Sequence, residues 1–177
     1  MMEKVQLSPQ KPREQKIYDW ATTGKTPDRE RNYITSLFLE AEIQERKNIQ
    51  LQEKFKRMKE SEVRYEEIMT KDADYILVAY GISARISESV IDIARKNGIK
   101  LGLLRPITLW PFPSQRIFEL AERIKGILCV EMSAGQMIED VQLAVQGKIE
   151  VKHYGRMGGS IASPSEVYNN FISLFLK

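Results

Sequence analysis

Three carboxylates near the third apolar run of the chain are the first residues that could do chemistry. Glu131 directly follows the run 127–130, and Glu139 and Asp140 come eight and nine residues later. Paired carboxylates can act as general acid and base when one of them is desolvated. Nothing in this spacing requires desolvation, and acidic side chains are rarely buried. We therefore expect a solvated or helix-capping role.

The single cysteine and the single histidine limit the other kinds of site. One Cys and one His cannot form a Cys/His metal cluster, a four-cysteine iron–sulfur site or an internal disulfide. His153 lies in an apolar-alternating run, and no Ser/His/Asp arrangement of the ordinary type is evident. Cys129 lies between Leu128 and Val130, which favours a buried structural thiol and fits an intracellular compartment.

A glycine-rich loop, Gly155-Arg-Met-Gly-Gly-Ser160, could bring backbone N–H groups close to a phosphate. The following helix is expected only from Pro164, and the loop lacks both a Gly-Lys-Ser/Thr ending and a full Gly-x-Gly-x-x-Gly pattern. A tight loop with positive φ angles is the favoured interpretation. A nucleotide or CoA binding module that uses the loop 155–163, with Arg156 supplying charge, stays open as the alternative.

The elements that position these residues alternate between strand and helix after Asp72. Apolar runs at 75–80, 101–104 and 127–130 predict strands covered on both faces, and the alternating run 149–154 predicts a strand nearer an edge. Helices are expected from about residues 83, 113, 136 and 164, the last with Ser163 and Glu166 as a capping box. Four βα units predict an α/β fold with a mostly parallel sheet between two helical layers, a three-layer α/β/α unit.

The residues before this unit have a different composition. We predict an extended or disordered arm over 1–27, a helical linker over 28–70, and the α/β domain over 71–177. Within the linker, a long helix is expected over about 41–69, with Leu51, Phe55, Met58 and Tyr65 on one apolar stripe. The stripe could pack on this chain's own domain or on another domain or subunit, and both remain open.

Composition excludes several classes of partner. Hydrophobic residues make up 42% and charged residues 29% of the chain, and the net charge is +3. The charges are mixed in sign along the sequence, so the basic stripe of a nucleic-acid groove is not expected. No apolar run approaches the roughly 20 residues of a membrane span, and residues 1–10 lack the apolar core of a secretory signal.

Several segments, taken in order, resemble the C-terminal part of the α subunit of 2-oxoacid:ferredoxin oxidoreductases, in their 2-ketoisovalerate (3-methyl-2-oxobutanoate) branch. The segments within the predicted α/β domain are Val78-Ala-Tyr-Gly81, Gly102-Leu-Leu-Arg-Pro-Ile-Thr-Leu-Trp-Pro-Phe-Pro113, Gly135-Gln-Met137 and Tyr154-Gly-Arg-Met-Gly-Gly159. Those before it are Trp20-Ala-Thr-Thr-Gly24, Asn32-Tyr-Ile-Thr-Ser-Leu37 and Glu62-Val-Arg-Tyr-Glu66. The resemblance covers about residues 18–170.

This resemblance implies a domain similar to the C-terminal domain of transketolase. The family oxidatively decarboxylates a 2-oxoacid to an acyl-CoA and passes electrons through iron–sulfur clusters to ferredoxin. Thiamine diphosphate and Mg²⁺ lie between the N-terminal domain of the α subunit and a β subunit. The implied partners are therefore that N-terminal domain, the β and γ subunits and, through the complex, ferredoxin. No catalytic residue of the family maps onto this sequence, so we expect a non-catalytic, cytoplasmic assembly domain without a cofactor of its own.

The expected contact surface lies on the loops that follow the strands. Large apolar side chains gather in these loops, and exposed patches of that kind are usually contact sites. The candidate residues are Trp110, Phe112, Met132, Gly135, Gln136, Met137, Arg156, Met157, Gly158 and Gly159. In the alternative interpretation, Trp110 and Phe112 cover the end of the sheet instead.

Overall fold

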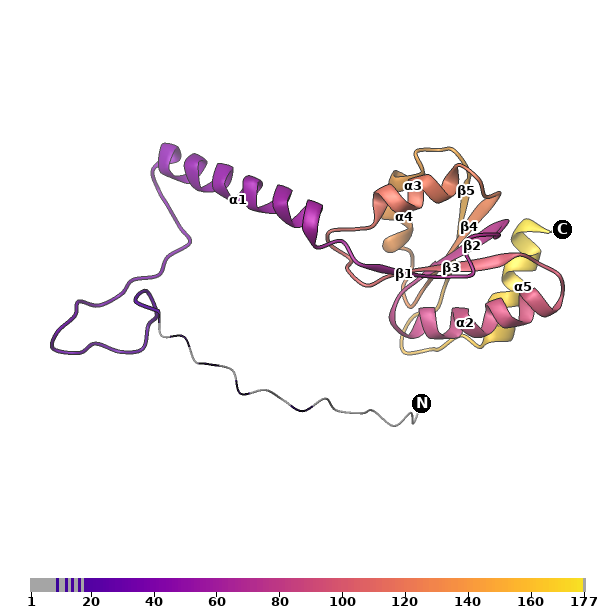
Figure 1. Ribbon diagram of the computed structural model, residues 1–177, viewed down its shortest axis with the longest axis horizontal. Coiled ribbons are helices and arrows are strands. Elements are labelled where there is room, and N and C mark those ends of the chain that lie inside the picture. The colour runs from indigo at the N-terminus through magenta and orange to yellow at the C-terminus, as the bar shows by residue number, and fades with distance from the viewer. Residues whose placement is uncertain (1–8, 10–11, 13, 15, 17, 177) are drawn as a thin grey trace. The chain divides into compact units, whose positions relative to one another are not determined.

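Five strands form one sheet in the order β1-β3-β2-β4-β5 in the computed structural model, which describes residues 9, 12, 14, 16 and 18–176 (Figure 1). The chain divides into two units, residues 1–50 and 51–177, and the sheet lies in the second. The four parallel strands are β2 (Tyr75–Ala79), β3 (Leu101–Pro106), β4 (Gly126–Glu131) and β5 (Glu150–Gly155). β1 (Tyr65–Ile68) pairs antiparallel with β3. As predicted, β5 is an edge strand.

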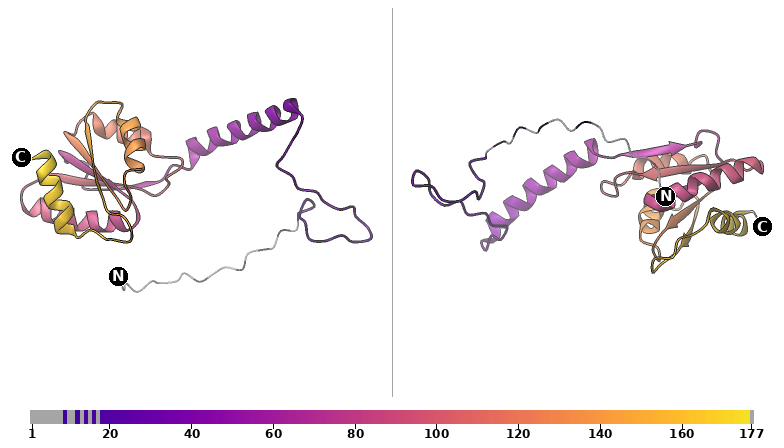
Figure 2. Two further views of the ribbon diagram at one scale, coloured as in Figure 1. Left: turned by 180° about the vertical axis from the view of Figure 1, so that it is seen from behind. Right: turned by 90° about the horizontal axis from the view of Figure 1, so that it is seen from below.

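Helices cover both faces of the sheet, which confirms the predicted three-layer α/β/α fold. α2 (Gly81–Lys96) and α5 (Pro164–Phe175) lie on one face, where Leu77, Leu103 and Leu128 are buried. α3 (Ser114–Ala121) and α4 (Met137–Val145) lie on the other, where Ile76, Val78 and Ile127 are buried (Figures 1 and 2). Because side chains alternate along a strand, strands that are apolar at successive positions supply both cores.

The start of α5 follows the predicted capping box. The Ser163 side chain accepts a hydrogen bond from the backbone N–H of Glu166 at 3.2 Å, and the Glu166 carboxylate accepts one from the N–H of Ser163 at 2.7 Å. Pro164 occupies the first turn, where its missing N–H costs nothing. This start places Phe171 in the core, where its ring lies 5.4 Å from that of Tyr75.

The prediction of one helix over about 41–69 was wrong at its C-terminal end. α1 spans Ala41–Ser61, and Tyr65, which we expected on its apolar stripe, begins strand β1. Pairing of β1 with β3 overrides the helix preference of Glu66 and Glu67, because propensity is weak beside tertiary contacts. The sheet therefore includes residues that precede position 71.

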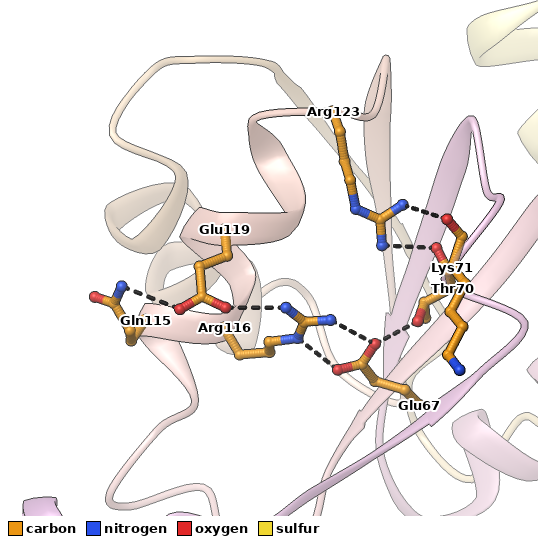
Figure 3. A network of polar contacts seen from close by, with 7 residues as sticks. All are labelled: Glu67, Thr70, Lys71, Gln115, Arg116, Glu119 and Arg123. Carbon is orange, nitrogen blue, oxygen red and sulfur yellow. Dashed lines mark hydrogen bonds and ion pairs between the residues drawn. The ribbon is translucent and has the colours of Figure 1, made fainter.

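Ion pairs and hydrogen bonds fix β1 and the turn after it (Figure 3). The Nε of Arg116, on α3, lies 2.6 Å from the Glu67 carboxylate, which also accepts a hydrogen bond from Thr70. The guanidinium of Arg123 donates to the carbonyls of Thr70 and Lys71 at 2.8 and 3.0 Å. Arg116 on α3 thus binds a side chain of β1, and Arg123, just after α3, binds the backbone of the turn that follows, so that strand is part of the domain.

The apolar stripe of α1 is only partly covered. Every residue of α1 is exposed or half-buried, and Leu51 is 45% exposed. Phe55 is half-buried and its ring lies 5.4 Å from that of Trp110. The division into an arm (1–27), a linker (28–70) and a domain (71–177) stays a prediction. Part of that arm lies outside the described residues, and the chain from 18 to 40 consists of turns and irregular structure.

Candidate functional site at the carboxyl ends of the strands

The loops that follow β2, β3, β4 and β5 lie along one edge of the sheet, because these strands are parallel. In the sheet, β3 lies on one side of β2 and β4 on the other. The chain therefore reverses the direction in which it adds strands after β3, when it crosses β2 to reach β4. The switch point therefore lies between β2 and β4, where α/β sheets usually bind ligands. The loop 132–136, between β4 and α4, flanks this point.

Glu131 ends β4 and is the most enclosed acid of the described chain, with 2% of its surface exposed. Its carboxylate accepts hydrogen bonds from the backbone N–H groups of Gln136, Met137 and Ile138 at 3.1, 2.8 and 3.0 Å. It accepts a further bond from the Ser133 hydroxyl at 2.9 Å. The carboxylate thus satisfies the free N–H groups of the first turn of α4, as an N-terminal cap does. The capping role was predicted, whereas the burial was not.

Burial by itself would raise the pKa of Glu131, because desolvation disfavours the charged form. The hydrogen bonds from Met137, Ser133, Gln136 and Ile138 together outweigh burial, so the pKa lies below its ordinary value. The carboxylate is therefore ionised at neutral pH. It cannot serve as a general acid there, and as a base it is already saturated with donors.

Acidification should reveal the contribution of Glu131 to stability. Because folding lowers the pKa of this group, its stabilising effect is complete above the ordinary value of 4.5 and disappears as the pH falls through the lower folded value. We expect Glu131→Gln to lower the free energy of unfolding by about 2 kcal/mol at pH 7. The difference in this free energy between the variant and the wild type should narrow below pH 4.5. Urea unfolding of both proteins at several pH values measures this. If the free energy of unfolding falls equally in both proteins down to pH 3, this expectation is contradicted.

Cys129 and His153 lie beside the Glu131 carboxylate. The Cys129 Sγ and the His153 Nε2 are 3.5 and 3.7 Å from the same oxygen, Oε1. Cys129 has no exposed surface, and burial raises its pKa above the ordinary range, so the predicted structural thiol is confirmed. Glu139 and Asp140 are exposed on α4 and do not join the cluster as a carboxylate pair. Within the described residues, no group of His, Cys, Asp and Glu side chains could hold a metal ion.

The glycine-rich loop and the start of α5 that follows it make most of their polar contacts within the chain. Gly158 and Gly159 have φ angles of +64° and +82°, as expected for a tight loop. Arg156, the residue that would supply the positive charge for a nucleotide or CoA, places its Nη2 3.3 Å from Oε1 of Glu166. Since Ser163 and Glu166 already cap α5, the backbone N–H groups of these two residues, which could otherwise receive a phosphate, have partners within the chain.

The predicted contact residues separate into exposed and buried groups. Trp110 and Met157 are 50% and 60% exposed, and Gln136 is exposed with Gly158 and Gly159. Gly135, Met132 and Arg156 are half-buried. The prediction was wrong for Met137, which is the first residue of α4, is 4% exposed and packs in the core. Phe112 packs partly against the same core, whereas the Trp110 ring is half exposed and lies 5.4 Å from that of Phe55.

Residues 73–167, more than half of the chain, match the family model for the pyruvate:ferredoxin oxidoreductase core domain II, so the chain belongs to this family. Among its relatives is ketoisovalerate oxidoreductase subunit VorB of Methanothermobacter marburgensis. The two sequences are 51% identical over 142 residues, which cover 80% of this chain and 40% of that protein. The chain spans about two fifths of the length of that protein and of the subunit VorB of Methanothermobacter thermautotrophicus.

Two solved structures share the fold at 15% sequence identity. The 2-oxoglutarate:ferredoxin oxidoreductase from Magnetococcus marinus, solved with 2-oxoglutarate, coenzyme A and succinyl-CoA bound, gives a TM-score of 0.63 over 77% of this chain and 24% of that one. A split gene transketolase, described as an inactive β4 tetramer, gives 0.54 over 64% and 41%. The transketolase-like architecture implied by the resemblance is therefore confirmed. Among the described residues, no helix is both long enough and apolar enough to cross a membrane.

Proposed function

We propose that this chain is the non-catalytic assembly domain of a thiamine-diphosphate-dependent 2-oxoacid:ferredoxin oxidoreductase of the 2-ketoisovalerate type. The observation that carries the proposal is the 51% identity to a ketoisovalerate oxidoreductase subunit. The parent enzyme would convert 2-ketoisovalerate and CoA to an acyl-CoA in the cytoplasm. Its electrons would pass to ferredoxin.

The cofactors of that reaction belong to other parts of the complex. The chain has a single cysteine, which cannot hold an iron–sulfur cluster by four thiolates. Its most enclosed carboxylate, Glu131, is fully engaged with donors of this same chain, and the described residues do not form a metal-binding group. The residues present therefore do not fit Mg²⁺ or an iron–sulfur cluster. Thiamine diphosphate and Mg²⁺ would lie between the N-terminal domain of the α subunit and the β subunit, and the iron–sulfur clusters elsewhere in the complex.

The contact surface would be the strand-end loops. Trp110, Gln136 and Met157 present exposed side chains there, and Gly158 and Gly159 let another backbone approach. The partner would be the remainder of the oxidoreductase, formed by the N-terminal domain and the β and γ subunits. Met137 is left out of this surface because it is buried, and Arg156 acts mainly on Glu166.

Reconstitution with the remaining parts of the enzyme tests this function. We expect the assembled complex to reduce ferredoxin with 2-ketoisovalerate and CoA. Met157→Glu should weaken assembly about tenfold or more on a sizing column, because it places a charge in an apolar contact. Its melting temperature should hardly change, since the side chain is 60% exposed.

Leu143→Glu is the matched control. Leu143 is 75% exposed and lies near the end of α4 that is away from the strand-end loops. This variant should assemble like the wild type. If Met157→Glu also assembles normally, the loop 156–163 is not part of the contact surface. If the wild-type chain neither assembles nor supports 2-ketoisovalerate-dependent reduction of ferredoxin, the proposed function is wrong.

A further inference from the structure

The loop 132–136 is short, lies at the switch point of the sheet, and is bound at both ends by one side chain. The Glu131 carboxylate holds Ser133 near the start of the loop and the N–H groups of Gln136 and Met137 where it enters α4. Four donors to Glu131, including Ile138, come from the next seven residues, and a fifth is the buried thiol of Cys129 on the same strand. The carboxylate thus closes the loop on itself, and it also lies 3.7 Å from Nε2 of His153 on β5.

The neighbouring strand β5 packs closely against this loop. A Cβ atom at Gly155 would overlap the carbonyl oxygen of Ser133 and lie 2.6 Å from Cε1 of His153. A Cβ at Gly135 would lie 3.6 Å from Nε2 of His153. The backbone of β5 and the imidazole therefore meet the loop with no room for a side chain at Gly155, which is why glycine is required there.

The outer side of the loop is open. Ala134 and Gln136 are exposed, while Met132, Ser133 and Gly135 are half-buried. A loop that is already ordered loses less conformational entropy on docking than a mobile one, so fixed loops bind more tightly for the same contacts. Within the proposed contact surface, this is the loop whose conformation depends on a single buried charge.

We infer that Glu131 is a positioning residue for assembly: together with Gly155 it holds the loop 132–136 in the conformation that docks on the remainder of the oxidoreductase. The inference rests on the proposed function. Its new content is that a buried acid at the switch point, where this fold usually receives a ligand, instead orders a protein-contact loop. Glu131 itself does not touch the partner.

Glu131→Gln tests the role of the charge, with Glu166→Gln as the matched control. Glutamine keeps the shape of the side chain, but it replaces one of the two acceptor oxygens that face the first turn of α4 with an NH₂ donor. Glu166 also caps a helix start, yet it does so at α5. We expect amide exchange over residues 132–138 to accelerate about tenfold or more in the first variant only. Assembly, measured well below either melting temperature, should weaken about tenfold in that variant only.

Gly155→Ala tests the same loop without changing a charge, and Gly102→Ala is its control. A Cβ at Gly102 would also meet a backbone carbonyl, that of Met69 at 2.8 Å, but beside β1 and away from the loop. Both variants should be less stable than the wild type. Only Gly155→Ala should accelerate exchange over 132–138 and weaken assembly.

The outcomes separate the inference from the function on which it rests. Wild-type assembly together with selective loss in Glu131→Gln and Gly155→Ala supports both. Wild-type assembly with normal assembly of these two variants, despite faster exchange in the loop, overturns the positioning role and leaves the function standing. Unchanged exchange over 132–138 in both variants overturns it as well. If the wild type does not assemble, the function fails, and the positioning role fails with it.

Discussion

A chain that begins at Asp72 is expected to be less stable by about 3 kcal/mol than one that begins at Glu62, with a melting temperature roughly 10 °C or more lower. The shorter chain lacks β1, so the backbone of β3 is left without a partner on that side. It also leaves Arg116 without Glu67, although both side chains are at most 30% exposed. Loss of Glu67 leaves Arg116 with Glu119, 2.9 Å from its Nη1, as its remaining acidic partner, and leaves the Nε side of the guanidinium poorly solvated.

Thermal unfolding followed by circular dichroism compares the two chains. Glu67→Ala in the longer chain is the control, and it should lose only part of this stability because the β1–β3 hydrogen bonds remain. We therefore expect the smallest stable domain to begin near residue 62 and not at residue 71. If the chain from Asp72 unfolds cooperatively within a few degrees of the longer one, β1 is dispensable.

Leu128→Ala is expected to destabilise the domain by about 2–5 kcal/mol. Leu128 lies in the middle of β4, between β2 and β5, and has no exposed surface. Truncating it leaves a cavity between the sheet and the layer of α2 and α5, because closely packed neighbours relax only in part.

Leu143→Ala is the matched control, since it removes the same atoms from a side chain that is 75% exposed. It should change the free energy of unfolding by no more than about 0.5 kcal/mol. Urea unfolding at neutral pH gives both values, and similar m-values would show that the denatured states are comparable. A loss below 1 kcal/mol for Leu128→Ala would mean that the core closes the cavity.

The sequence predicted the four βα units because their signals are local. The continuous apolar run of β4 and the Ser163–Glu166 capping box each identify an element without reference to the rest of the chain. β1 carries no such signal. Two of its four residues are glutamates, and they lie in a strand because β3, Arg105 and Arg116 pair with them across about 40 to 50 residues.

The candidate site was predictable only in its location. Glu131 was recognised at the end of a strand, where functional residues gather, but its burial depends on four donors from the following turn. His153 could not be placed beside it from sequence, because their proximity follows from the parallel register that pairs Cys129 with His153. Met137 was expected on the surface because it follows a loop, yet the rotation of α4 turns it inward.

The burial of Cys129 also makes the protein convenient for site-specific labelling. The chain has one cysteine, its side chain is fully enclosed within the sheet, and its raised pKa keeps it in the unreactive thiol form. A cysteine introduced at an exposed position would therefore be the reactive thiol for a maleimide dye, without removal of the native one. Pairs of fluorophores attached in this way could report the distance between the strand-end loops and another subunit in solution.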